Sequence, residues 1–349
     1  MGTHLRVTVL AAAAALALAA CDPAITPWQA DVSYQDADFV AMPAAERTPA
    51  PPPRALDIYR PDPAPANAPV IVYVPGGGWA AQNKRHTALP GGFQHYLDLG
   101  FVFVSIDYTH TDRDAGPRWP AHVEDVDRAV RWVRHNAAAL GVDPHRVVLA
   151  GQSAGAHLAA MQAIGAFPDP ALPPSLAAES GRPDGLVLMS GPFDLEHIDL
   201  SGLSCITVNG TQVCNGDPLR NLLGCDYEPS PTAECLEALR SASPMADRYR
   251  DEVAALPPTF VAVSVDDQVV PAIQGLGFAA QICPQPDDPS QPGDQSKPGP
   301  ETHFEPVAGS DHEIATLPTG VVDQFLRLWQ TSIPRDDSAR ASYVCPAVP

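Results

Sequence analysis

Positive charge is scarce in this sequence of 349 residues. It contains 21 Lys and Arg residues against 41 Asp and Glu residues, so its formal net charge is −20 at pH 7. A surface that binds nucleic acid needs basic residues to meet the phosphate backbone, and this composition argues against such a partner. The acidic excess instead favours a soluble, self-repelling surface.

Paired cysteine spacings are also missing. The sequence has 7 cysteines, and none of them forms the C-x-x-C pair that is typical of a structural zinc site. Apart from Cys21 their number is even, which in an exported protein favours disulfides over metal thiolates. We therefore expect no metal site and a set of disulfides among Cys205, Cys214, Cys225, Cys235, Cys283 and Cys345.

The N-terminus lacks an apolar run long enough to cross a bilayer, which takes about 20 residues. The run at 7–18 follows a short polar start and leads into Leu18-Ala19-Ala20-Cys21. These four residues resemble a bacterial lipobox, and an ordinary signal peptide is the alternative interpretation. The resemblance implies a lipoprotein signal peptide at 1–20 and a protein exported to the bacterial cell envelope. We expect membrane anchoring through a lipid on Cys21.

Residues 21–53 are rich in Ala, Pro and acidic residues. This composition predicts a tether that connects the lipid anchor to a folded domain, with an edge strand near 38–41. The remaining residues, 54–349, are enough for one large α/β domain with embellishments or for two modest domains, and we expect one.

Short apolar runs alternate with helical patterns along this domain. Between residues 123 and 133, for example, apolar residues recur at helical spacing and charged residues occupy much of the rest. Such alternation predicts an α/β fold with a mostly parallel, doubly wound sheet flanked by helices. The expected strands lie at 56–59, 70–74, 101–106, 147–150, 185–189, 260–265 and 304–307.

The stretch from about 197 to 239 interrupts the alternation. We interpret it as a small cap insertion that disulfides staple because it lacks a core of its own. Within it, Asn209-Gly210 suits a two-residue hairpin turn that would place two cysteines opposite each other. Cys225 and Cys235 are close in the sequence, which suggests a second disulfide between them. The two cysteines left over would form the third. The expected disulfides are Cys205–Cys214, Cys225–Cys235 and Cys283–Cys345.

The most informative stretch is Gly151-Gln152-Ser153-Ala154-Gly155, which lies between an apolar run and an Ala-rich helical pattern. A G-x-S-x-G sequence between a strand and a helix is typical of a nucleophile elbow. Ser153 would then lie at a sharp turn, where flanking glycines avoid steric clashes. The alternative is a serine that only caps an ordinary helix.

Two further motifs precede this elbow, one directly after an expected strand and one at the end of the next. They are Pro75-Gly76-Gly77-Gly78-Trp79 and Ser105-Ile106-Asp107-Tyr108. With these motifs the chain resembles the α/β-hydrolase superfamily, in its lipase/esterase branch with a glycine-rich oxyanion loop. Bacterial carboxylesterases and carbohydrate or feruloyl esterases belong to that branch.

The resemblance implies roles for the glycine-rich motif. The backbone N–H groups of Gly77, Gly78 and Ala154 would bind the oxyanion. Pro75 stands where the family usually has a histidine that supports the loop. Trp79 could line the acyl pocket, with packing as an equal explanation.

The remaining members of a triad are expected after the elbow in the chain. In Asp266-Asp267-Gln268-Val269-Val270-Pro271 the family pattern makes Asp267 the acid, with Asp266 as the alternative, and Asp107 structural. His312 is the expected base, because among the residues after Asp267 the only other histidine is His303, at the start of a strand. His122 and His157 are assigned to packing or to the surface.

These residues predict a serine carboxylesterase that acts on short acyl or aryl esters, including carbohydrate-linked ones. Ser153, His312 and Asp267 would form the triad, with no metal or organic cofactor. An amide hydrolase of the same fold, such as an arylformamidase or an exopeptidase, is the alternative enzyme. A hydrolase fold without activity, kept for binding at the envelope, is the third interpretation.

Overall fold

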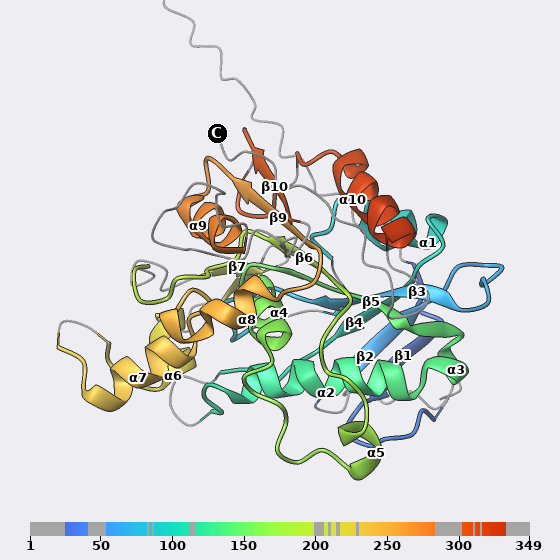
Figure 1. Cartoon of the computed structure of the whole chain (residues 1–349), viewed down its shortest axis with the longest axis horizontal. Coiled ribbons are helices and arrows are strands. Elements are labelled where there is room, and N and C mark those ends of the chain that lie inside the picture. Colours follow the sequence, from blue (N-terminus) through green and yellow to red (C-terminus); the bar gives the residue numbers. More distant parts are fainter. Residues whose placement is uncertain are drawn as a thin grey trace, which may run out of the picture.

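The structure is a computed structural model built around one sheet of eight strands in the order β1-β2-β4-β3-β5-β6-β9-β10 (Figure 1). The residues that it describes are 25–40, 54–81, 84–85, 87–111, 116–198, 206–208, 211–213, 217–227, 230–282, 302–309, 311–314 and 316–332.

Neighbouring strands of this sheet run parallel from β4 to β10, while β2 is antiparallel to both β1 and β4. The strands are β1 (Gln29–Ser33), β2 (Ala55–Tyr59), β3 (Ala68–Val74), β4 (Val102–Ile106), β5 (Val142–Gln152), β6 (Gly185–Met189), β9 (Thr259–Ser264) and β10 (Thr302–Val307). Each strand expected in the domain from residue 54 onward overlaps one of these, so the mostly parallel sheet is confirmed.

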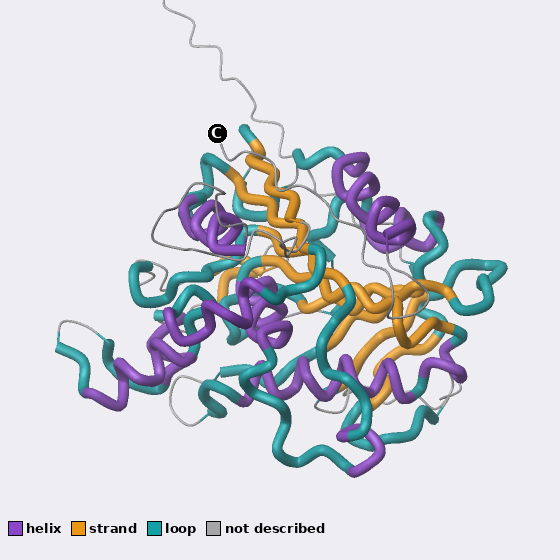
Figure 2. The backbone as a smooth tube through the Cα atoms, in the orientation of Figure 1, coloured by secondary structure: helices purple, strands orange, loops and turns teal. Residues whose placement is uncertain are grey.

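Helices cover both faces of the sheet, as Figure 2 shows for strands in orange between helices in purple. Helices α1 and α10 contribute to one buried cluster, and α2, α4 and α9 to the other. None of the helices described has the length and hydrophobicity needed to cross a membrane. The helices are α1 (Gly92–Asp98), α2 (Ala121–His135), α3 (Ala137–Leu140), α4 (Ala154–Ile164), α5 (Pro174–Ala177), α6 (Pro218–Leu223), α7 (Ala233–Ser241), α8 (Arg250–Ala254), α9 (Ile273–Ile282) and α10 (Thr319–Ser332), with a 3₁₀ turn at Asp247–Tyr249.

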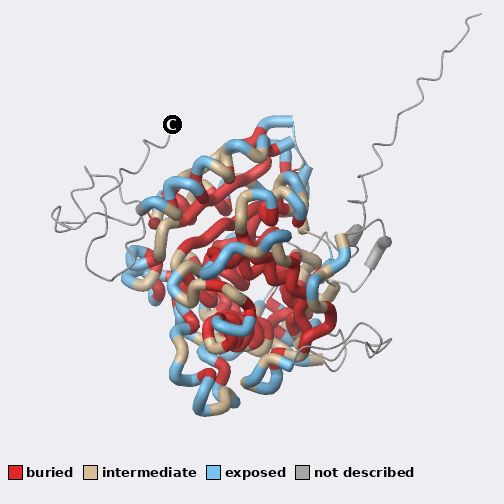
Figure 3. The backbone as a smooth tube through the Cα atoms, turned by 90° about the vertical axis from the view of Figure 1, so that its right-hand side faces the viewer, coloured by how far each residue is buried: buried red, intermediate tan, exposed pale blue. Residues whose placement is uncertain are grey.

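The apolar runs of the sequence are explained by burial on both faces. Along β3, Val70 and Val72 belong to the core cluster under α2 and α4, whereas Ile71 and Tyr73 belong to the cluster under α1 and α10. Side chains alternate across a strand, so a strand that is covered on both sides needs apolar residues at every position. Figure 3 shows the result as buried backbone, in red, through the middle of the molecule.

The insertion between β6 and β9 contains the β7–β8 hairpin (Ile206–Val208 and Thr211–Val213) and helices α6 and α7. The hairpin pairs Val208 with Thr211, as expected from the turn sequence. A disulfide joins Cys225 to Cys235 and confirms that pair. The other cysteines lie outside the described residues, namely Cys21, Cys205, Cys214, Cys283 and Cys345.

The N-terminal segment at 25–40 differs from the expected tether. Strand β1 pairs with β2 at the edge of the sheet, and Tyr34 is fully buried. The edge strand expected near 38–41 is wrong, because the strand lies at 29–33 and residues 38–40 are not in a strand. The folded domain therefore begins before residue 54.

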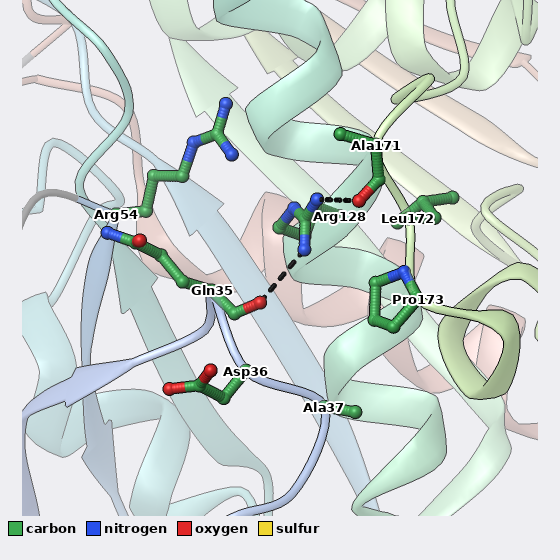
Figure 4. A pocket seen from close by; sticks show the side chains of 8 residues that line it. All are labelled: Gln35, Asp36, Ala37, Arg54, Arg128, Ala171, Leu172 and Pro173. Carbon is green, nitrogen blue, oxygen red and sulfur yellow. Dashed lines mark hydrogen bonds between the residues drawn. The ribbon is translucent and has the colours of Figure 1, made fainter.

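Polar side chains of the domain fasten this segment. Arg128 of α2 donates hydrogen bonds to the backbone oxygens of Gln35 and Ala171 at 2.9 and 2.7 Å (Figure 4). The Asn136 side chain accepts from the Phe39 N–H at 2.8 Å. A hollow of about 370 Å³ remains along this seam, lined by Gln35, Asp36, Ala37, Arg54, Arg128, Ala171, Leu172 and Pro173. The segment is thus held by hydrogen bonds to its backbone as well as by the burial of Val32 and Tyr34.

Two buried histidines lie on the α2 and α4 side of the sheet. His122 and His157 are both fully buried, in agreement with the packing role expected for them. Burial lowers the pKa of His122 from 6.5 to about 3, with smaller contributions from His157, His110 and Arg118. Neither ring nitrogen of His122 has a hydrogen-bond partner within the described part of the chain. His122 is therefore neutral in the folded protein.

We expect His122→Phe to weaken the acid sensitivity of the fold. The unfolded chain takes up a proton on His122 near pH 6.5, whereas the folded chain does so only near pH 3. The free energy of unfolding therefore falls as the pH is lowered through this window, by about 1 kcal/mol per pH unit for this one group. Urea unfolding at pH 7, 6 and 5 should show a shallower decline for His122→Phe than for the wild type. Equal declines would contradict the assignment.

Candidate active site

Ser153 lies in the sharp turn between β5 and α4. Its backbone has φ 56° and ψ −125°, a strained conformation for a residue with a side chain. A Cβ atom at Gly151 would overlap the backbone of Gly155, and one at Gly155 would overlap the carbonyl oxygen of Val74. The two glycines of the motif thus allow the backbone contacts that hold the turn, and the predicted elbow geometry is present.

His312 lies between Ser153 and Asp267. Its Nε2 is 2.8 Å from Ser153 Oγ, and its Nδ1 is 2.7 Å from Asp267 Oδ2. A carboxylate can only accept here, so Nδ1 carries the proton and Nε2 is free to accept from the serine hydroxyl. The side chain of Asp267 is 1% exposed and that of His312 20%. A buried acid and a partly exposed base are the arrangement that proton transfer from Ser153 requires.

The charge on Asp267 is stabilised by its hydrogen bonds. Its Oδ1 accepts from the N–H groups of Val269 and Val270 at 2.7 and 2.9 Å. Burial alone would raise the pKa of Asp267, but the hydrogen bond and charge of His312 and these two N–H groups outweigh it and lower the pKa below 3.8. Asp267 is therefore ionised at neutral pH.

The alternative acid and the alternative base have other partners. Asp266 Oδ2 accepts from the Gly309 N–H at 2.9 Å, which fixes the loop that leads to His312. His303 of β10 stacks on Phe260 at 5.1 Å and is 3.2 Å from Glu305. The geometry of the site therefore uses Asp267 and His312.

The glycine-rich motif forms a tight turn directly after β3, and residues 75–81 are here termed the oxyanion turn. Gly77 has φ +127°, and a Cβ atom there would overlap the carbonyl oxygen of Ala81. The N–H groups of Ala80 and Ala81 donate to Gly77 O at 3.2 and 3.0 Å. The N–H groups of Gly77, Gly78 and Ala154 donate no hydrogen bond to another of the described residues. These three N–H groups are the donors that the sequence assigns to the oxyanion.

Trp79 packs in the core and does not line a pocket for the acyl group. It is 1% exposed, and its indole N–H donates to His157 Nδ1 at 3.1 Å. The Nε2–H of His157 in turn donates to Ala242 O at 2.7 Å. Because Nδ1 must accept, His157 is neutral, in line with burial that lowers its pKa to about 4. The packing interpretation of Trp79 therefore holds.

Gln152 is a site residue that the sequence did not single out. It is 6% exposed, and its side-chain amide donates to His312 O at 3.1 Å. Its side-chain oxygen occupies the space that a Cβ atom at Gly76 would need. Gln152 thus connects the oxyanion turn to the loop of the base. The only signal was its place before Ser153, at a position that the G-x-S-x-G pattern leaves open.

We expect Gly155→Ala to destabilise the fold, because the added methyl group would meet backbone atoms of Val74 and Pro75 that cannot rotate away. Overpacking of this kind costs about 1–3 kcal/mol or more. Gly320→Ala is the matched control in α10, where a Cβ atom meets nothing within 4 Å. It should be neutral or stabilise the fold by up to about 1 kcal/mol. Equal unfolding free energies for the two variants in urea would contradict the close approach.

Known proteins share this fold. A carbohydrate esterase from gut microbiota has a TM-score of 0.62 at 22% identity, covering 89% of this chain and 98% of that one. The thermophilic esterase Est2 of Thermogutta terrifontis with bound butyrate has a TM-score of 0.56 at 24% identity, covering 86% and 93%. These similarities support the α/β-hydrolase fold that the motifs predict.

Curated relatives match part of the chain. Esterase LipQ of Mycobacterium tuberculosis is 34% identical over 229 residues, which are 65% of this chain and 49% of LipQ. Carboxylesterase NlhH of the same organism is 38% identical over 106 residues, 30% of this chain and 32% of NlhH. The chain thus spans about half the length of LipQ, and a smaller share of NlhH.

The BD-FAE family model matches residues 56–282. This range includes the oxyanion turn, Ser153 and Asp267, while His312 follows it in the chain. The match covers more than half of the sequence and agrees with the geometry of the site, and we conclude that the chain belongs to the BD-FAE family.

Proposed function

We propose that this protein is a serine carboxylesterase that hydrolyses short acyl or aryl esters. The observation that carries the proposal is the continuous line of hydrogen bonds from Ser153 through His312 to Asp267. It begins at a strained elbow and lies beside a turn of glycines whose N–H groups are unpaired within the described residues. A nucleophile, a base, an orienting acid and oxyanion donors are the parts that acyl transfer requires.

In the acylation step, Ser153 Oγ attacks the ester carbonyl carbon while its proton moves to Nε2 of His312. The N–H groups of Gly77, Gly78 and Ala154 stabilise the tetrahedral oxyanion. Collapse of this intermediate breaks the ester C–O bond, and the leaving alcohol takes the proton from His312. Water then attacks the acyl group with His312 as base, which releases the carboxylic acid and restores Ser153.

The substrate class is part of the proposal. The two curated relatives described above are an esterase and a carboxylesterase, and the structural neighbours include a carbohydrate esterase and an esterase with bound butyrate. We therefore favour short acyl groups, with carbohydrate-linked esters as the first natural candidates. A non-catalytic hydrolase fold would not need Ser153, His312 and Asp267 within hydrogen-bond distance of one another.

Labelling with a fluorophosphonate probe tests the proposal directly, because the probe reacts with an activated serine. We expect the wild type to be labelled and Ser153→Ala to be unreactive while keeping the same circular dichroism spectrum. Asp267→Asn should slow labelling by roughly 10³–10⁴-fold, since His312 then adopts the wrong tautomer.

Asp266→Asn is the matched control for the acid. It leaves the hydrogen bond between His312 and Asp267 in place, so its labelling should slow by less than about 10-fold. An unreactive wild type, or a labelled Ser153→Ala, would rule out the proposed nucleophile. A larger effect for Asp266→Asn than for Asp267→Asn would reassign the acid.

We propose in addition that the protein is exported and held at the membrane by a lipid on Cys21. The support is the apolar run at 7–18, the lipobox-like Leu18-Ala19-Ala20-Cys21 and the Cys225–Cys235 disulfide, a bond typical of oxidising compartments. Strand β1 begins at Gln29, so an extended chain of about 25–30 Å at most separates the lipid from the sheet. The first strand of the domain would then lie close to the bilayer surface.

Metabolic labelling of a bacterial host with an alkyne-bearing palmitate analogue tests the anchor. We expect the full chain to be labelled and to enter the detergent phase of Triton X-114. Cys21→Ser should abolish both results and leave the fluorophosphonate reaction unchanged. An unlabelled wild type, or a labelled Cys21→Ser variant, would contradict the proposal.

A further inference from the structure

The oxyanion turn is attached to the residues that follow β4. The Tyr108 hydroxyl donates to Pro75 O at 3.1 Å, at the start of the turn. The N–H of Thr111 donates to Trp79 O at 2.8 Å, near its middle. These bonds hold the turn from outside.

A third attachment runs through Lys84, a few residues after the turn. Its ammonium nitrogen is 2.6 Å from Asp107 Oδ2 and 3.0 Å from Asp31 Oδ1, and its side chain is 5% exposed. Burial alone would lower the pKa of Lys84, but Asp107, Asp31 and Asp57 outweigh it and raise the pKa above 10.5. Lys84 is therefore positively charged. Its ammonium group lies between the carboxylate of Asp31 in β1 and that of Asp107, the residue after β4.

Asp31 reaches this bridge from the N-terminal strand β1 by way of an irregular backbone. The register of β1 against β2 shifts between Gln29 and Val32, and Asp31 has φ 55°. The left-handed conformation costs roughly 1–2 kcal/mol for a residue with a side chain. The Asp31 N–H donates to Asp57 Oδ1 at 2.7 Å, and its carboxylate also binds Arg85 at 3.0 Å. The bulge thus turns a carboxylate of an edge strand toward the chain that follows the oxyanion turn.

We propose that Asp31 is a positioning residue for the oxyanion turn and acts through Lys84. The N-terminal strand then adds support for the turn from outside it. This inference rests on the proposed esterase function, because it assigns Asp31 an effect on oxyanion binding. Asp31 itself touches neither the substrate nor Ser153.

Asp31→Asn is a suitable variant because the charge cluster tolerates it. Three carboxylates, those of Asp31, Asp57 and Asp107, surround the two cations Lys84 and Arg85. Loss of one carboxylate leaves the two cations with two carboxylates, so no buried charge is left without a partner. The amide keeps the shape of the side chain. We therefore expect the variant to fold.

The experiment measures kcat and KM with a p-nitrophenyl ester, and the affinity for a trifluoromethyl ketone that forms a tetrahedral adduct. Asp31→Asn should lower kcat by about 10-fold with KM nearly unchanged, since oxyanion donors act mainly in the transition state. The affinity for the ketone should fall by a similar factor. Amide hydrogen exchange at Ala80 and Ala81 should become faster, because both N–H groups close the turn on Gly77.

Two control variants on the same segment separate positioning from general loosening. Asp36→Asn makes the same chemical change at an exposed position, and Val32→Ala removes buried apolar contacts of β1 without touching Lys84. Both should keep wild-type kcat at temperatures where they are folded. A decrease in kcat for Val32→Ala as large as for Asp31→Asn would overturn the inference.

The outcomes also distinguish this inference from the proposed function. An active wild type with an unchanged kcat in Asp31→Asn overturns the role of Asp31 and leaves the esterase intact. An inactive wild type overturns the esterase function. The hydrogen-exchange measurement, which needs no activity, then tests the role of Asp31 by itself. Unchanged exchange at Ala80 and Ala81 in Asp31→Asn overturns the coupling, and faster exchange supports it.

Discussion

The approach of helix α4 to the end of β3 is the contact on which the site depends. Gly155 lies against the carbonyl oxygen of Val74 so closely that no side chain fits between them. Strands β3 and β5 are parallel neighbours, so they end at the same edge of the sheet. The nucleophile after one strand and the oxyanion turn after the other are thereby brought to one reacting carbon. Acyl transfer needs this proximity, because misplacement by about 1 Å can cost a factor of 100 in rate.

The surroundings of two titratable side chains near this contact keep His157 neutral and Asp267 ionised. His157 stays neutral because burial lowers its pKa and because its Nδ1 accepts the N–H of Trp79. Asp267 stays ionised because His312 and two backbone N–H groups donate to it. The packing histidine thus supports the oxyanion turn without adding charge.

The sequence predicts those parts of the structure that carry a local signal. Strands covered on both faces appear as continuous apolar runs, and the elbow and the acid each follow such a run. The base follows the edge strand β10, whose apolar signal is weaker. Strand β1 was missed because its five residues, QADVS, include only two apolar ones, and its pairing with β2 is made by backbone groups that leave no pattern in the sequence. The position of Gln152 was overlooked because its partners, His312 and Gly76, are distant in sequence. For Trp79 the sequence left two roles open, pocket lining and packing, and its burial in the structure shows that it packs in the core.

Contacts from outside the oxyanion turn support it, beginning at Pro75. Proline loses a side-chain donor and a backbone N–H, but it keeps the carbonyl oxygen that accepts from Tyr108, and its ring restricts φ. Thr111 holds the turn at Trp79, and Lys84, which follows the turn in the chain, is held by Asp107. In the proposed arrangement Lys84 carries the support to Asp31 and the N-terminal strand. The segment nearest to the expected lipid anchor is therefore also part of the framework that shapes the active site.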